Sequence, residues 1–255
     1  MRPLILLSND DGYAAPNLVA VQTELARHVD VVVCAPESNQ SATSHSLSLH
    51  RVLRLRQVEA GVFAIDGTPA DCVYIALHAG TRLLPRRPDL IVSGMNHGLN
   101  LGSDVFYSGT VAAAREGALR GIPSIALSAD AGADRAAAAA LGVRLALALL
   151  AGSHRTELRA APLLNVNIPA GNAWRVRATC IGARLYTEDV VFRQDPRGRE
   201  YLWIGGAGVR HDLVPGSDTE AFDEGWASVT PLTLDLSAAQ HAQIAADVAV
   251  AADVA

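Results

Sequence analysis

The sequence predicts an α/β protein built on a doubly wound, mostly parallel sheet of the three-layer, Rossmann-like kind, with a C-terminal β-hairpin arm. Short apolar runs alternate with helix-like segments through the first two-thirds of the 255 residues. Uninterrupted apolar strands joined by crossover helices are typical of a parallel sheet that is covered on both faces. Connections of this kind are right-handed, so they place helices on both sides of the sheet.

The expected elements follow from the apolar pattern in chain order. The strands are short apolar runs, as expected of segments buried on both faces: residues 4–7, 30–35, 89–96, 124–129 and 162–169. The helices between them are amphipathic or rich in Ala and Leu, and one ends where Gly121 and Pro123 interrupt it: residues 17–28, 111–120 and 134–150.

The pattern changes after about residue 174. Residues 187–205 predict an arm of two strands around a turn, in which Asp195, Pro196 and Gly198 suit the corners of a type I turn. A lone hairpin is marginally stable, so we expect this arm to pack on another surface, for example another subunit. Residues 1–236 are expected to form one domain, and the Ala-rich tail 237–255 a helix or a disordered segment.

Composition excludes several classes of function. The net charge of −5 and the pI of about 5.9 argue against a stable nucleic-acid complex. The cysteines Cys34, Cys72 and Cys180 lie far apart without metal-ligand spacing, which argues against a zinc site and against a disulfide framework. The N-terminus does not resemble a signal peptide, and no run reaches the roughly 18 apolar residues of a membrane span. We therefore expect a cytoplasmic protein without a membrane partner.

Two adjacent acids end the first expected strand, in Asn9-Asp10-Asp11-Gly12. Two unit charges about 4 Å apart repel by roughly 4 kcal/mol at an effective dielectric of about 20. A metal ion, a shared proton or water must offset this repulsion, unless the acids only cap a helix or turn the loop. A haloacid-dehalogenase-type phosphatase is excluded, because its nucleophilic Asp would fall on Asn9, and an amide cannot form the aspartyl-phosphate.

Two further polar stretches follow strands of the same expected sheet. "APESNQSATSHSLSLH", residues 35–50, is rich in hydroxyls, although composition alone also suits a flexible polar loop. A later strand ends in Asn96, and Ser108-Gly109-Thr110 then opens a helix. A helix N-terminus with small hydroxyl residues suits a phosphate group, although ordinary N-capping gives the same pattern. Ligands gather at the carboxyl ends of the strands in such folds, so these stretches are expected to meet there.

Taken together, the motifs resemble the SurE (stationary-phase survival) family of metal-dependent nucleotidases. One departure is the "SAT" after Gln40, where the family more often has Gly after the Ser. The resemblance covers most of the chain and is carried, in the family's order, by "ILLSNDDGYAAPNL", "APESNQSATSHSLSL", "GTPADCVYIAL", "SGMNHGLNLGSDVFYSGTVAAAREG", "IPSIALS", "LNVNIP", "DPRGREYLWIG" and "PGSDTEAFDEGWASVTPL".

The resemblance implies one divalent ion, Mg²⁺ or Mn²⁺, held by Asp10, Asp11, Ser41 and Asn96. Two carboxylates, a hydroxyl and an amide oxygen form the all-oxygen set that a hard cation prefers. We expect Asp10 and Asp11 to be catalytic, with Asn9 orienting water. The expected phosphate cradle is Asn100, Ser108, Gly109 and Thr110.

The implied reaction is hydrolysis of nucleoside 5′- and 3′-monophosphates, with short-chain polyphosphate as a further substrate. Asp104 and His45 are candidates for the general acid, and no aromatic cluster in the sequence clearly marks a base pocket. The resemblance also implies a homodimer or homotetramer built through the hairpin arm. The alternatives are a phosphatase of broad small-molecule specificity and a non-catalytic metal- or nucleotide-binding module.

Overall fold

A nine-stranded sheet forms the centre of the protein, with the strand order β3-β4-β2-β1-β5-β6-β7-β13-β8. We describe a computed structural model at residues 2–152, 161–186, 190–204 and 208–252. The six central strands are parallel, which confirms the expected doubly wound α/β fold. They are β4 (Val62–Ile65), β2 (Asp30–Pro36), β1 (Leu4–Ser8), β5 (Leu90–His97), β6 (Ser124–Ala129) and β7 (Leu163–Ile168).

Strands at both edges depart from the parallel pattern. β3 (Leu55–Glu59) runs antiparallel to β4, and β13 (Ala227–Pro231) runs antiparallel to β7 and parallel to β8 (Val176–Ala178). All five residues of β3 are exposed, so its sequence lacks the apolar run by which the buried strands are recognised. The apolar pattern also gave no strand for the short β4 that pairs with it.

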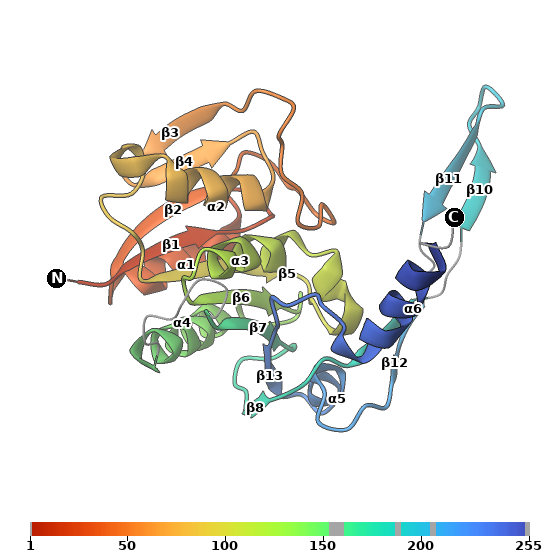
Figure 1. Cartoon of the computed structure of the whole chain (residues 1–255). Coiled ribbons are helices and arrows are strands. Elements are labelled where there is room, and N and C mark those ends of the chain that lie inside the picture. The colour runs from red at the N-terminus through yellow and green to blue at the C-terminus, as the bar shows by residue number, and fades with distance from the viewer. Residues whose placement is uncertain (1, 153–160, 187–189, 205–207, 253–255) are drawn as a thin grey trace.

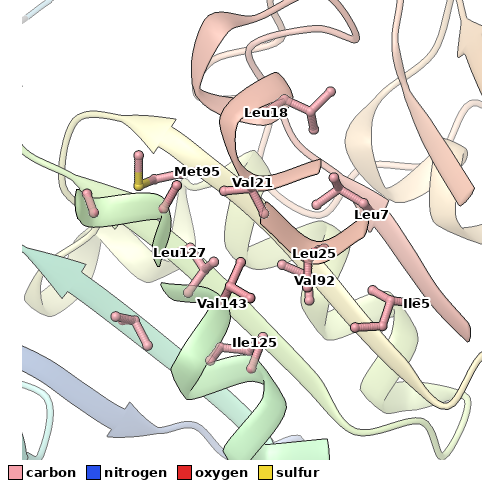
Figure 2. Close-up of a cluster of buried hydrophobic side chains, with 14 of the residues drawn as sticks. Ile5, Leu7, Leu18, Val21, Leu25, Val92, Met95, Ile125, Leu127 and Val143 are labelled. Atoms are coloured by element: carbon pink, nitrogen blue, oxygen red, sulfur yellow. The ribbon is translucent and has the colours of Figure 1, made fainter. Parts of the chain in front are cut away.

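Helices cover both faces of the sheet (Figure 1). α1 (Pro16–Ala26) and α4 (Arg135–Gly152) pack on one face, whereas α2 (Pro69–His78) and α3 (Gly109–Leu119) pack on the other. Alternate residues of β1 point to opposite faces, as a strand requires. Ile5 and Leu7 therefore join the cluster under α1 and α4 (Figure 2), whereas Leu4 and Leu6 join the cluster under α2 and α3.

Among the described residues, α4 is the one helix that is long and apolar enough to cross a membrane, judged by length and composition alone. In this fold it is a helix of the outer layer instead. Its side chains Ala138, Val143 and Ala146 are buried in the same cluster as Leu18 and Leu25 of α1. One face of α4 is thus buried against the sheet and α1.

The C-terminal part carries short pairs of strands and two helices. β9 (Ala183–Tyr186) pairs with β12 (Val209–Asp212), and β10 (Val190–Gln194) pairs with β11 (Glu200–Ile204). The β10–β11 hairpin stands away from the sheet (Figure 1), and every residue of both strands is exposed. It matches the expected arm, of which residues 187–189 and 205 lie outside the described residues. The remaining elements are α5 (Asp218–Asp223), α6 (Ala242–Ala252) and 3₁₀ turns at Gly80–Arg82, Gly102–Phe106 and Ala239–His241.

Candidate active site

The expected site residues emerge where the winding of the sheet reverses. From β1 the chain proceeds to β2 on one side, and from the adjacent β5 it proceeds to β6 on the other side. Ser8 pairs with Ser93, so the segments that follow these two residues leave the same edge side by side. Such a reversal opens a crevice at the carboxyl ends of the strands, which is the usual ligand site of this architecture.

Asn9 shapes the turn that carries the two acids. Its side-chain nitrogen donates to the Gly12 carbonyl at 2.9 Å, and its side-chain oxygen accepts the Gly12 N–H at 3.2 Å. Asn9 is fully buried, and Gly12 has a φ of 102°, in the region that favours glycine. Both ends of the Asn9 amide therefore close the loop, which differs from the expected role of orienting water.

Asp10 is a buried carboxyl group beside the start of α3. It is 4% exposed, and the Thr110 hydroxyl donates to its Oδ1. Burial raises the pKa of Asp10 to about 6, with the hydrogen bond from Thr110 opposing the rise and the charge of Asp11 adding to it. Keeping this carboxylate ionised is therefore costly without a counter-charge, and a cation at this position would supply one.

Asp11 connects the ends of two strands. Its Oδ2 accepts the backbone N–H of His97 at 2.9 Å, and its Oδ1 accepts the side-chain amide of Asn39 at 3.3 Å. The side-chain oxygen of Asn39 in turn accepts two hydrogen bonds from Ser41, one from its backbone N–H at 2.8 Å and one from its hydroxyl at 2.6 Å. Because Ser41 donates its hydroxyl proton to Asn39, the lone pairs of its oxygen stay available for a cation.

Asn39 was not among the expected site residues, although it lies in the polar stretch after β2. In "SAT" this chain has Ala42 after Ser41, where the family more often has Gly. Ala42 has a φ of 58°, in the region that favours glycine, so the structure shows why Gly suits this position. The backbone of the loop is tied to the first acid by a hydrogen bond of 2.8 Å from the Gln40 N–H to the Asp10 carbonyl.

Asn96 follows an irregularity in β5, where the register with β6 shifts between Ser93 and Asn96. Gly94 is required there: it has a φ of 122°, and a Cβ would lie 2.2 Å from the Leu127 carbonyl oxygen. The Asn96 side-chain nitrogen donates to the Gly98 carbonyl at 3.0 Å. The amide oxygen is therefore the end of this side chain that can serve a cation.

Ser108, Gly109 and Thr110 form the N-terminus of α3, next to Asp10. Ser108 is the N-cap, and its hydroxyl accepts the Val111 N–H at 3.1 Å. Thr110 donates to Asp10, so both hydroxyls are engaged within the fold. What this turn offers to a phosphate is the positive end of the helix and its first backbone N–H groups, rather than the two hydroxyls.

Asn100 lies in a buried polar network at the ends of β6 and β7. Its side-chain nitrogen donates to the Ser128 hydroxyl at 2.7 Å, and its N–H donates to Asn167 at 2.7 Å. Its carbonyl accepts the side-chain amides of Asn165 at 2.8 Å and Asn167 at 3.1 Å. The network fixes the loop after β5. Asn165 and Asn167 were missed, although two amides in a buried strand are a visible signal in "LNVNIP".

The two candidates for the general acid are both held by partners. The Asp104 carboxylate accepts a hydrogen bond from the guanidinium of Arg184 at 2.8 Å and one from the hydroxyl of Tyr186 at 2.7 Å. His45 Nε2 lies 2.9 Å from the carboxylate of Glu116, a residue of α3 that is 1% exposed. Asp104 therefore anchors β9 to the 3₁₀ turn at Gly102–Phe106, and His45 anchors the Ser41 loop to α3.

The donor set suits a hard cation. The described residues contain no group of three or more His, Cys, Asp and Glu side chains that could hold a metal ion. Asp10, Asp11, Ser41 and Asn96 instead lie in segments that follow the strand ends at the sheet reversal, and two carboxylates, one hydroxyl and one amide oxygen match the ligand chemistry of Mg²⁺ or Mn²⁺. The burial of Asp10 is the observation that most directly calls for a positive charge at this place.

Comparison with known proteins gives one consistent result. The model of the family described as survival protein SurE matches residues 5–188. The 5′-nucleotidase SurE of Sorangium cellulosum is 79% identical over 245 residues, which is 96% of this chain and 95% of that protein. The 5′-nucleotidase SurE of Methylococcus capsulatus is 47% identical over 236 residues, covering 91% of this chain and 92% of that protein.

A solved structure agrees with the sequence relatives. The crystal structure of the SurE protein from Aquifex aeolicus superposes with a TM-score of 0.80 at 36% identity. The match covers 94% of this chain and 97% of that one. Fold and sequence therefore point to the same family over nearly the whole length of the chain.

Proposed function

This chain belongs to the SurE family, and from that premise we propose that it hydrolyses nucleoside 5′-monophosphates to nucleoside and phosphate. The protein is a 5′-nucleotidase, as the names of its relatives at 79% and 47% identity indicate. The observation that carries the assignment to this site is the contact of Asp10, the neighbour of Asp11, with the N-terminus of α3 at the reversal of the sheet. We extend the proposal to 3′-monophosphates and short-chain polyphosphate as further substrates.

We assign the metal site to Asp10, Asp11, Ser41 and Asn96. One Mg²⁺ or Mn²⁺ held there would polarise a phosphoryl oxygen and lower the pKa of a bound water. Asp10 supplies a desolvated carboxylate, whose hydrogen bond from Thr110 fixes its orientation. Asp11 is fixed by the His97 N–H and by Asn39, and Asn39 also orients the Ser41 hydroxyl.

We assign the substrate phosphate to the N-terminus of α3. Ser108, Gly109 and Thr110 would bind it through backbone N–H groups, whose dipoles favour an anion. Asn100 belongs to this cradle through the loop that its buried network holds in place. Asn9 contributes by holding the turn of Asp10 and Asp11, so its removal would displace both acids.

The assignment of nucleotide hydrolysis to this site can be tested against the two alternatives that the sequence left open. In a phosphatase of broad specificity, the same site would accept many small phosphate esters. In a binding module, the site would hold metal and nucleotide without turnover. Rates of phosphate release from 5′-AMP, 3′-AMP and an aryl phosphate separate these cases. The nucleotidase requires kcat/KM to be highest for the nucleotides, whereas equal values would support broad specificity and no turnover with any ion would support the module.

We further propose that the arm joins subunits into a homodimer or homotetramer in the cytoplasm. The described part of the arm exposes a dense set of apolar side chains, which a lone hairpin cannot bury: Val190, Val191, Phe192, Tyr201, Leu202, Trp203 and Ile204. The free state of Cys34, Cys72 and Cys180 suits a reducing compartment. Replacing Phe192 and Trp203 by Ser should lower the molar mass measured by light scattering, and an unchanged mass would contradict this assembly.

A further inference from the structure

Two consecutive aromatic side chains are exposed beside the proposed phosphate cradle. Phe106 ends the 3₁₀ turn Gly102–Phe106 and is 60% exposed, and Tyr107 follows it and is 66% exposed. Single exposed apolar residues are common on protein surfaces. Here, however, two consecutive large aromatic residues are exposed to solvent directly before Ser108, the N-cap of α3.

The chain itself limits how far these rings lie from the site. Consecutive Cα atoms are about 3.8 Å apart, so the Cα of Tyr107 lies within about 7.6 Å of the Cα of Gly109. A Cβ on Gly109 would lie 2.8 Å from the Cβ of Asp10, so this part of α3 is in direct contact with the acid. In a nucleotide the base is separated from the phosphate by one ribose. A phosphate at the N-terminus of α3 therefore leaves the base within reach of this surface.

Three hydrogen bonds hold the backbone of Phe106 and Tyr107. The Ser44 hydroxyl donates to the Phe106 carbonyl at 2.6 Å, and the Ser44 N–H donates to the Tyr107 carbonyl at 3.0 Å. The Tyr107 N–H donates to the Asp104 carbonyl at 3.0 Å, and the Asp104 carboxylate is bound by Arg184 and Tyr186. A surface whose backbone is fixed in advance loses little conformational entropy when a ligand stacks on it.

The same contacts tie this surface to the metal site. Ser44 lies three residues after Ser41 on the loop that Asn39 links to Asp11. One short loop thus contributes a proposed metal ligand and also positions the aromatic pair. Both residues are more than half exposed, so packing against the rest of the described chain does not explain the pair.

We propose that Tyr107, with Phe106 beside it, is the surface on which the base of the nucleotide stacks. This inference rests on the proposed nucleotidase function and names the part of the substrate that the metal and the cradle do not bind. Every base has a π-face, so stacking tolerates different bases. Purine nucleotides, which have the larger face, should bind better than pyrimidine nucleotides, without strict selection of one base.

The test compares a substrate that has a base with one that lacks it. KM and kcat are measured for 5′-AMP and for ribose 5-phosphate with the wild type, Tyr107→Ala, Phe106→Ala and Tyr107→Phe. We expect Tyr107→Ala to raise KM for 5′-AMP about tenfold or more, with little change for ribose 5-phosphate. Tyr107→Phe should retain the wild-type KM, because stacking requires the ring and not the hydroxyl.

A control variant and a second measurement keep the outcomes separate. Leu213→Ala removes an apolar side chain that follows β12 and is 82% exposed. It should leave KM and kcat unchanged for both substrates. An unchanged KM for 5′-AMP in both alanine variants would overturn the inference. An equal rise in KM, or an equal fall in kcat, for both substrates would also overturn it, because the two residues would then act on the structure of the site. A change in molar mass by light scattering would overturn it in favour of a contact between subunits. If the wild type hydrolyses neither substrate, the proposed function fails instead.

Discussion

Gly109 and Asp10 are in such close contact that a Cβ on Gly109 would lie 2.8 Å from the Cβ of Asp10 and 3.0 Å from its Oδ2. The two residues are far apart in the sequence, yet they join the end of β1 to the start of α3. The proposed metal ligand and the proposed phosphate cradle are therefore one packed unit. A change on either side must displace the other.

Gly109→Ala should lower kcat/KM for 5′-AMP about a hundredfold, because a displacement near 1 Å is enough for a loss of that size. Its free energy of unfolding should fall by only about 1–2 kcal/mol, since overpacking is partly offset by the higher helix propensity of Ala. Gly152→Ala is the matched control, because nothing lies within 4 Å of a Cβ at the end of α4. Normal activity in Gly109→Ala would contradict the packed unit.

Asp11→Ala should abolish metal-dependent turnover and leave the fold intact. The carboxylate is only partly buried and accepts two hydrogen bonds, from His97 and Asn39, so its loss should change the melting temperature of the metal-free protein little. Activity with added Mn²⁺ and circular dichroism measure the two effects. Asp212→Ala, on exposed β12, should remain fully active. An active Asp11→Ala protein with unchanged metal dependence would refute the assignment of Asp11 to the site.

Asn39→Ala should weaken metal binding without removing any ligand. Residues that orient metal ligands typically change metal affinity about 10- to 100-fold when they are replaced. Asn39 holds both Asp11 and Ser41, so its loss frees two of the four proposed ligands. The Mn²⁺ concentration that gives half-maximal activity should rise accordingly, whereas exposed Asn172→Ala should leave it unchanged. An unchanged Mn²⁺ concentration for Asn39→Ala would contradict the claim that Asn39 orients the metal ligands Asp11 and Ser41.

The buried carboxyl group of Asp10 should make the metal-free protein less stable as the pH rises from about 4 to about 6. Its pKa is raised to about 6 by burial from an ordinary value of 3.8, so the folded state keeps a proton that the unfolded state has lost. By linkage, the Asp10 contribution to the free energy of unfolding falls through this window by up to about 3 kcal/mol.

Thermal unfolding with a chelator present, at several pH values, measures this contribution as the difference between the wild type and Asp10→Asn. The difference between the two proteins should change across the window and then level off above about pH 6. Saturating Mg²⁺ should stabilise the wild type most at pH 7, where the carboxylate is ionised. A difference that does not vary with pH would show that Asp10 does not titrate in this range.

Much of the sheet could be predicted because its strands are buried on both faces and read as apolar runs. The strand expected at 124–129 has the bounds of β6, and helix 134–150 differs from α4 only at the ends. The edge strands were missed for the opposite reason. β3 reads "LRQVE" and is exposed throughout, so no apolar run or clean alternation marks it.

The candidate site was less predictable, because sequence indicates which residues are polar and not how they pair. Asp10, Asp11, Asn96 and the start of α3 could be grouped from their places at strand ends. Asn39 could not be distinguished from its neighbours in a polar stretch, since its importance lies in bonds to Asp11 and Ser41. Likewise, Glu116 is a surface-like residue in sequence, and only the fold buries it against His45.

The central claim is that the oxygen ligands at the reversal of the sheet bind a divalent ion that is required for nucleotide hydrolysis. The most direct test is phosphate release from 5′-AMP by protein stripped with a chelator, before and after Mn²⁺ or Mg²⁺ is restored. We predict that activity disappears on stripping and returns with the ion. Equal activity with and without the ion would contradict the claim, because Asp10 and Asp11 would then act without a metal.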